Sequence, residues 1–218
     1  LPPEAYLGVA GLTGMTAYIG LKRIIELKEG ETLWMSAAAG AVGSAGVQFA
    51  KAMGANVIAT AGGKEKTDFC TEIGADAVVD YKATDDLARA VRTAAEPFGG
   101  VDAYFENVGG DHLQAALDVI KPHGRMAVCG MIARYNDDTP LPGPTNLTQI
   151  IAKKLKVQGF ILSDHFDLQG EFIKDLSDWM MAGKVKTRDT VYDGIEQTPD
   201  AFMGLFTGAN IGKMLVKL

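Results

Sequence analysis

Residues 37–44 (AAAGAVGS) form a run of small side chains between an expected buried strand and an expected amphipathic helix. The spacing is Ala-x-Gly-x-x-Gly, with Ala38 in the place of the first glycine and with Gly40 and Gly43 in the other two. Small residues let a backbone approach a pyrophosphate, and a helix N-terminus offers free N–H groups and the positive end of its dipole. The run predicts a nucleotide-binding turn. The alternative is tight helix–strand packing in an alanine-rich chain.

The residues after the second expected strand indicate which nucleotide would bind. An NAD site places Asp or Glu there to hold the ribose 2′-hydroxyl. Residues 61–66 (AGGKEK) have no acid at the strand end and carry Lys64 and Lys66. Lysines attract a 2′-phosphate, so the sequence favours NADP(H) over NAD(H). The alternative is that both lysines only begin a solvated helix.

Three further side chains lie at or after expected strand ends, where parallel sheets bind ligands. Asn107 precedes two glycines and offers an amide for a ribose or a carboxamide, or it only forms a turn. Tyr81 ends the third strand and could pack beside the adenosine, or it is only a boundary aromatic. Tyr135 lies in a long loop and could cover the cofactor, or it is only a loop-tip tyrosine.

The sequence gives little support for metal binding, for a serine hydrolase, for a P-loop nucleotide site or for methyl transfer. His112, His123 and His165 are scattered, and Cys70 and Cys129 have no CxxC neighbour, so no metal site is expected. There is neither a Gly-x-Ser-x-Gly elbow nor a Walker lysine after the glycines. An S-adenosylmethionine-dependent methyltransferase shares the glycine-rich first turn but usually has an acid where this chain has lysines.

Alternating strand and helix patterns position these residues. Such alternation with buried strands predicts a doubly wound α/β fold, a six-stranded parallel sheet of the Rossmann type. The expected strands cover residues 32–37, 56–60, 77–81, 101–108, 125–129 and 156–162, and the expected helices cover 42–53, 64–73, 85–95, 112–120, 147–154 and a stretch around 172–180.

The two ends do not follow this alternation. Residues 1–27 predict two helices, over 3–9 and 13–26, joined at Gly11. Residues 191–218 predict an extended piece, a helix over 199–206 and a final strand over 213–218 with no evident partner.

Composition sets the class of protein. The chain has 218 residues, 47% hydrophobic and 22% charged, with a net charge of −6, which argues against nucleic acid or an anionic membrane as the main partner. No apolar run reaches the length of a membrane span, and no signal peptide is evident. Two distant cysteines indicate a reducing compartment, so a cytoplasmic location is expected.

The chain resembles the zinc-independent medium-chain dehydrogenase/reductases. It is most similar to the leukotriene B4 12-hydroxydehydrogenase / prostaglandin reductase group, which includes alkenal double-bond reductases and curcumin-reductase-like enzymes. The matching motifs, in chain order, are GLTGMTAY (11–18), AAAGAVGS (37–44), EK (65–66), YK (81–82), ENVGG (106–110), GR (124–125), CG (129–130), YN (135–136), GF (159–160) and NIGK (210–213).

This resemblance implies an NADPH-dependent reductase of the carbon–carbon double bond of α,β-unsaturated carbonyl compounds. Its motifs imply that residues 39–42 contact the pyrophosphate and that Lys66 and Tyr81 serve the 2′-phosphate end. The full set of implied cofactor-binding residues is Ala39, Gly40, Ala41, Val42, Gly43, Lys66, Tyr81, Asn107, Cys129, Gly130, Met131, Tyr135, Phe160, Ile161, Leu162 and Asn210.

The resemblance also implies a division of the chain. Residues 1–27 would be interdomain helices, 28–190 the NADP-binding domain, and 191–218 a return to a GroES-like catalytic domain that would precede residue 1. A tyrosine that some relatives have near the sixth strand is replaced by Ala152, so no catalytic residue is assigned. A homodimer paired through the sixth strand is expected. The alternatives are a quinone reductase, or a fragment that binds NADP(H) without catalysis.

Overall fold

The computed structural model describes residues 3–136, 138–139 and 142–218. Within these residues, a parallel sheet carries helices on both faces, which confirms the expected doubly wound α/β fold. The strand order β3-β2-β1-β4-β5-β6 means that the chain starts near the middle of the sheet and winds outward in both directions. The strands are β1 (Thr32–Met35), β2 (Asn56–Ala61), β3 (Ala77–Asp80), β4 (Val101–Glu106), β5 (Ile120–Val128) and β6 (Lys156–Gly159).

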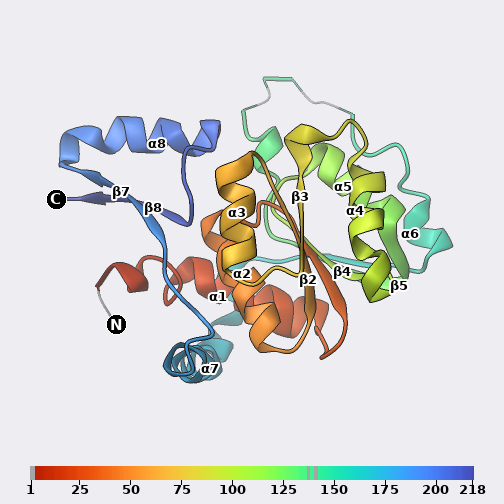
Figure 1. Ribbon diagram of the computed structural model, residues 1–218, viewed down its shortest axis with the longest axis horizontal. Coiled ribbons are helices and arrows are strands. Elements are labelled where there is room, and N and C mark those ends of the chain that lie inside the picture. The colour runs from red at the N-terminus through yellow and green to blue at the C-terminus, as the bar shows by residue number, and fades with distance from the viewer. Residues whose placement is uncertain (1–2, 137, 140–141) are drawn as a thin grey trace.

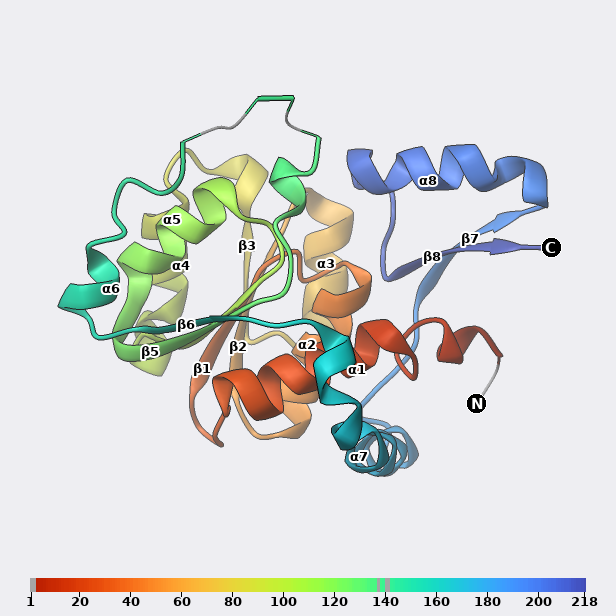
Figure 2. The same cartoon turned by 180° about the vertical axis from the view of Figure 1, so that it is seen from behind.

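Figures 1 and 2 show the two helical layers from opposite sides. One layer contains α1 (Leu12–Ile19), α2 (Ala41–Ala52), α3 (Lys64–Glu72) and α7 (Gln169–Met181). The other contains α4 (Leu87–Ala95), α5 (Gly110–Val119) and α6 (Gln149–Ala152). Short 3₁₀ segments connect them: η3 (Tyr81–Ala83), η4 (Glu96–Phe98), η5 (Ile132–Arg134) and η6 (Leu162–Leu168). No helix of the described residues is long and apolar enough to cross a bilayer.

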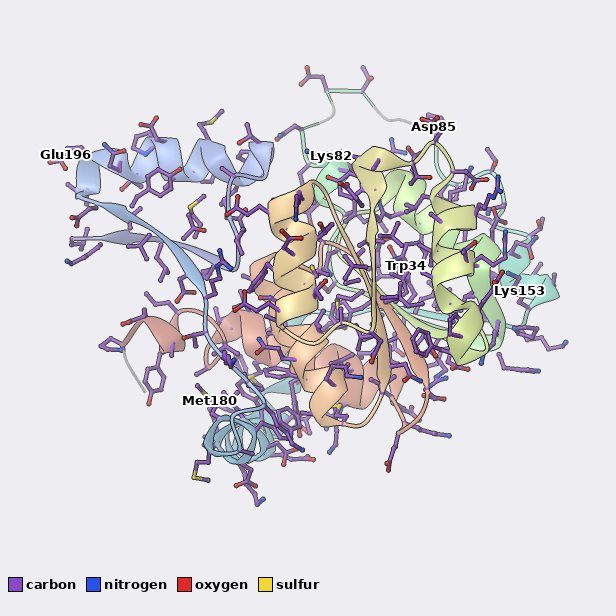
Figure 3. The ribbon with its side chains drawn as sticks, viewed as in Figure 1. Trp34, Lys82, Asp85, Lys153, Met180 and Glu196 are labelled. Atoms are coloured by element: carbon purple, nitrogen blue, oxygen red, sulfur yellow. The ribbon has the colours of Figure 1, made fainter. Side chains whose placement is uncertain are left out.

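Strand β1 is buried on both faces. Successive side chains of a strand point to opposite sides. Leu33 and Met35 therefore pack in the layer of α2 and α7, and Trp34 packs on the other side, with its ring centroid 4.6 Å from that of Tyr104. Figure 3 shows Trp34 on the α4 side of the sheet. This double burial explains why the strand is a continuous apolar run rather than an alternating one.

The turn from β1 into α2, residues 37–44, is called the glycine turn below. A Cβ atom at Gly43 would lie 2.2 Å from the carbonyl oxygen of Ala37 and 2.7 Å from the Cα of Ala38. A Cβ atom at Gly40 would lie 3.2 Å from that oxygen, in a backbone conformation that any residue adopts. Packing therefore requires glycine at position 43 but not at position 40.

Residues 189–217 form a second β–α–β arrangement, called the C-terminal unit below. Its strands β7 (Asp189–Asp193) and β8 (Lys213–Lys217) are parallel and paired, and η7 (Ile195–Gln197) and α8 (Thr198–Thr207) connect them. The expectation of a final strand without a partner in the chain is therefore wrong. The sequence pattern does not reveal this partner, because a helical crossover separates parallel strands along the chain. In Figure 1 this unit projects to the left of the main sheet.

Several element boundaries differ from expectation. Strands β4 and β6 end at Glu106 and Gly159, short of residues 108 and 162, and β5 begins early, at Ile120, across an irregular register with β4. The helix expected over 147–154 is limited to α6, and in the segment before it Gln114 Oε1 accepts a hydrogen bond from the backbone N–H of Thr145.

The N-terminal helices are also shorter or less regular than expected. Residues 3–9 contain only the 3₁₀ turn η1 (Pro3–Tyr6), and α1 continues as the π-helix η2 (Gly20–Ile25). Gly20 lies so close to Phe105 that a Cβ atom there would be 2.2 Å from the ring.

Glu106, at the end of β4, is a fully buried carboxyl group. Its Oε1 accepts from the N–H of Val108 at 2.6 Å and from Ser36 Oγ at 3.3 Å. Burial raises the pKa of Glu106 above its ordinary value, although these hydrogen bonds oppose the change. Among the described residues, its Oε2 has no hydrogen-bond partner, and neither does the hydroxyl of Tyr104 on the same strand.

We expect Gly43→Ala to lower the free energy of unfolding by about 1–3 kcal/mol, the usual cost of forcing a methyl group into a close-packed contact. Gly40→Ala is the matched control and should lose less than about 1 kcal/mol, since only an N-cap preference changes. Urea unfolding followed by circular dichroism measures both. Equal losses would show that the glycine turn can relax around an added methyl group.

Glu106→Gln should change how stability depends on pH. An acid whose pKa is raised by folding stabilises the fold at low pH, and that contribution is lost as the pH rises through the raised pKa. In urea unfolding, the wild-type chain should therefore lose stability relative to the glutamine variant as the pH rises above 4.5, the ordinary pKa of a glutamate. The exposed Glu29→Gln is the control. A difference that does not vary with pH would contradict the assignment.

Candidate functional site

A cleft of about 960 Å³ opens at the carboxyl edge of the sheet. The glycine turn, the start of α3, the loops after β3, β4 and β5, and the end of α8 line it. The residues that we expected to bind a cofactor and that line this cleft are Ala39, Gly40, Ala41, Val42, Gly43, Lys66, Tyr81, Asn107, Cys129, Gly130, Tyr135 and Asn210. The fold thus brings together residues from six separate segments of the chain.

The N-terminus of α2 points its backbone into this cleft. Gly40 is the N-cap residue, and no side chain caps the helix. The first N–H groups of a helix have no partner within the helix, and the dipole places positive potential there. Ala41, Val42 and Gly43 line the cleft at this point. The helix start therefore suits an anionic group such as a pyrophosphate.

Lys66 enters the cleft from α3, and its Nζ donates to the carbonyl oxygen of Gly208. Burial and the nearby Lys82 lower the pKa of Lys66. A Cβ atom at Gly62 would lie 2.8 Å from Lys82 Cε and 2.9 Å from Tyr81 Cε1, so both side chains lie against the end of β2. In Figure 3, Lys82 lies at the same end of the molecule as Asp85, beyond the carboxyl edge of the sheet.

Lys64 and Lys66, which the sequence predicted together, have different surroundings in the structure. Lys64 is exposed, and its Nζ pairs with Asp68 at 2.6 Å, one helical turn further on. It does not line the cleft. Of these two lysines, only Lys66 offers its ammonium group to the cleft. The alternative, that the lysine only begins a solvated helix, therefore holds for Lys64 and not for Lys66.

Tyr81 packs edge-on against His112, with ring centroids 5.1 Å apart. His112 is 5% exposed, and burial lowers its pKa to about 4, so its ring is neutral at physiological pH. In the described structure the Nε2 of His112 is buried without a hydrogen-bond partner. His112 thus forms an uncharged floor beneath Tyr81, and it is a lining residue that the sequence prediction did not include.

Asn107 ties the ends of three strands together. Its Nδ2 donates to the carbonyl of Ser36 at 2.8 Å, and its Oδ1 accepts from the thiol of Cys129 at 3.0 Å. Nδ2 also donates to Met35 Sδ at 3.6 Å, so one lone pair of the amide oxygen remains for a ligand. Burial raises the pKa of Cys129 to about 12, so its thiol stays protonated and acts as a donor. The side chain of Asn107 therefore joins strand ends and also lines the cleft.

Tyr135 holds the loop that follows β5. Its hydroxyl accepts from the N–H of Met131 at 3.2 Å, while the side chain remains 63% exposed. Part of the long loop, residues 137, 140 and 141, lies outside the described residues.

The other expected residues, Met131, Phe160, Ile161 and Leu162, do not line the cleft. Phe160 and Leu162 pack against the core layer of α1 and α7, and Ile161 is 66% exposed. Their role in cofactor binding stays a prediction. Ala152, the position of the missing tyrosine, is exposed at the end of α6 and is not part of the cleft.

A group of further lining residues was not expected from the sequence. The rule that ligands bind beyond the carboxyl ends of strands could have found those that follow β3 and β4. The expected role of Asn210 indicated the loop after α8, but nothing in the sequence indicated that the end of α8 itself would reach the cleft. The missed residues include Thr84, Asp85, Asp86, Asp111, His112, Asp118, Leu205, Phe206, Thr207 and Gly208.

Known proteins share this sequence over nearly its whole length. The family model described as "Zinc-binding dehydrogenase" matches residues 41–181. The chain is 42% identical to the NADP⁺-dependent 2-alkenal reductase of Nicotiana tabacum, over 99% of this chain and 62% of that protein. It is 40% identical to prostaglandin reductase 1 of Rattus norvegicus, over 100% of this chain and 66% of that protein. The chain thus spans a little under two thirds of these curated relatives.

A solved structure is also similar. The structure of CurA from Vibrio vulnificus in complex with NADPH matches with a TM-score of 0.92 and 40% identity, over 99% of this chain and 65% of that one. The family description names zinc, but the described residues hold no group of three His, Cys, Asp or Glu side chains that could bind a metal ion. The family match and these relatives together show that the chain belongs to the zinc-binding dehydrogenase family, the medium-chain dehydrogenase/reductases.

Proposed function

We propose that this chain binds NADP(H) and is the cofactor-binding part of an enzyme that reduces the carbon–carbon double bond of α,β-unsaturated carbonyl compounds. One observation carries the proposal: a single cleft joins an uncapped helix start to the ammonium group of Lys66. The end of β2 beside that lysine carries no carboxylate in residues 61–63. The relatives named as a 2-alkenal reductase and a prostaglandin reductase support the substrate class.

The cleft fits such a cofactor in its charge pattern. The N–H groups at the start of α2 would hold the pyrophosphate, because the uncapped helix end and its dipole favour an anion. Lys66 and Tyr81 would hold the 2′-phosphate end. Asn107, the loop over 129–135, residues 160–162 and Asn210 would line the remainder. When bound, NADPH supplies the hydride that reduces an activated double bond.

The residues that line the cleft would bind and position the cofactor, and none of them is suited to transfer a proton. The thiol of Cys129 has its pKa raised to about 12 and already donates to Asn107, so it is a poor proton donor. His112 is neutral and buried beneath Tyr81. We therefore propose no catalytic residue within this chain.

We also propose the division into interdomain helices (1–27), cofactor-binding domain (28–190) and a return to a catalytic domain (191–218). Exposed apolar side chains of the C-terminal unit support a covering partner domain: Val191, Ile195, Phe202 and Met203. Because the matched relatives are longer than this chain, the activity belongs to the whole protein.

The edge strand β6 is the surface that we propose for a homodimer. It lies at one end of the sheet order and leaves Val157 exposed. Unprotected edge strands invite pairing with another chain. A cytoplasmic location remains a proposal from the sequence; Cys70 and Cys129 are both free thiols in the structure.

Lys66→Met should weaken binding of NADPH by about tenfold to a hundredfold, since a charge-assisted hydrogen bond to the 2′-phosphate is lost. NADH binding should change less than about twofold, because NADH lacks that phosphate. Lys64→Met is the matched control and should leave both affinities unchanged. Fluorescence titration of each variant with each cofactor measures these effects. Equal losses for NADPH and NADH in Lys66→Met would contradict the assignment.

The protein that contains this chain should oxidise NADPH in the presence of a small enal or enone, followed by absorbance at about 340 nm. Quinones provide the comparison, because a quinone reductase would use the same cofactor cleft. Turnover with quinones alone would replace the proposed substrate class. Steady-state turnover by the 218-residue chain itself would exclude a fragment that only binds.

A further inference from the structure

The C-terminal end of α8 is the least expected part of the cleft wall. Thr207 and Gly208 line the cleft, although α8 belongs to the C-terminal unit and not to the parallel sheet. Figures 1 and 2 both show this end of α8 beside the start of α3, the helix that carries Lys66. The contact between them is the hydrogen bond from Lys66 Nζ to the carbonyl oxygen of Gly208.

This carbonyl is suited to hold a cation. Gly208 caps the helix in the left-handed region with φ +70°, and its carbonyl lies at the end of the α8 dipole that carries partial negative charge. Lys66 needs such a partner, because it is half-buried and lies near a second ammonium group, that of Lys82. The Gly208 carbonyl and the α8 dipole offset the cost of burying the Lys66 ammonium group and its repulsion by Lys82.

The carbonyl is also held in place relative to the cleft. The N–H of Ala209 donates to Gly204 at 2.8 Å, which fixes the end of the helix. Beyond Gly208, the N–H of Gly212 donates to the carbonyl of Ala39 at 2.8 Å, which ties the same loop to the glycine turn. The loop over 208–212 is thus anchored to the cleft wall at both ends.

A second cation attaches the C-terminal unit to α3. The guanidinium carbon of Arg188, just before β7, lies 4.9 Å from the centre of the Phe69 ring. Its nitrogens lie 3.6 Å from a carboxylate oxygen of Glu72 and 3.9 Å from one of Glu65. The C-terminal unit is therefore attached to α3 by Arg188 as well as by the contact between Lys66 and Gly208.

An ammonium group has three N–H donors. One of them is directed at Gly208, which leaves two for the oxygens of a phosphate in the cleft. We infer that Gly208 is a positioning residue for the 2′-phosphate of NADPH: its carbonyl, at the C-terminal end of α8, holds the ammonium group of Lys66 in the cleft. The inference rests on the proposed function, because it concerns the same cofactor. It makes the C-terminal unit a determinant of the preference for NADPH over NADH.

Gly208→Ala tests this directly. Its Cβ atom would lie 3.2 Å from Lys66 Nζ, and φ +70° is unfavourable for alanine, so the substitution disturbs both the carbonyl and the ammonium group. Gly183→Ala is the matched control, since Gly183 has φ +68° and no atom lies within 4 Å of its added Cβ. The backbone cost is therefore similar, and the contact with Lys66 is absent.

Fluorescence titration measures the dissociation constants for NADPH and for NADH. The proteins compared are the wild-type chain, Gly208→Ala, Gly183→Ala, Lys66→Met and the double variant that combines Gly208→Ala with Lys66→Met. The expected result is a loss of about tenfold for NADPH in Gly208→Ala, with NADH unchanged within about twofold. The loss should disappear in the Lys66→Met background, because Gly208 acts through that lysine.

Four results would overturn the inference. If Gly208→Ala lost the same affinity for NADPH and for NADH, the effect would be purely structural. If its preference for NADPH over NADH were unchanged, Lys66 would need no support from Gly208. The same change of preference in Gly183→Ala would assign the effect to backbone strain. A wild-type chain that binds neither cofactor would refute the proposed function itself, and this outcome is distinct from the other three.

Discussion

The approach of α2 to β1 at the glycine turn is the constraint on which the cleft depends. The helix lies so close to the strand that position 43 has no room for a side chain, since a Cβ atom would be 2.2 Å from the Ala37 carbonyl. This closeness directs the start of α2 toward the carboxyl edge of the sheet, where its free N–H groups meet the cleft. The packing explanation and the binding explanation for the glycines are therefore two consequences of one geometry.

Much of this arrangement was predictable from the sequence. Buried strands such as β1 and glycine-terminated helices such as α2 indicated a parallel sheet, and loops after strand ends placed Asn107 and Tyr81 at its carboxyl edge. Local patterns could not show that β7 pairs with β8, because pairing across a helical crossover leaves no trace in neighbouring residues. They could not separate Lys64 from Lys66 either, since the position around the helix decides which lysine faces Asp68 and which faces the cleft.

Polar groups beneath the cleft show how the site is kept rigid. Ser36, Glu106 and Asn107 exchange hydrogen bonds between the ends of β1 and β4, and Cys129 adds the end of β5. Burial raises the pKa of the thiol and lowers that of His112, so the positive charge that the cleft presents comes from the start of α2 and from Lys66. Hydrogen bonds are strong in such a buried setting, which favours one fixed arrangement of the loops even though Glu106 Oε2 has no partner among the described residues.

The hydrogen bond from Gly212 to Ala39 has a consequence for how the protein is made. It joins a turn that leaves the ribosome early to a loop that leaves it much later. Contacts between distant parts of a chain form slowly, and domains generally fold from the N-terminal side during synthesis. The parallel sheet can therefore assemble while translation continues, but the cleft acquires its last wall only afterwards. A nascent chain would pass through a stage with a nearly complete sheet and an open, weakly binding site.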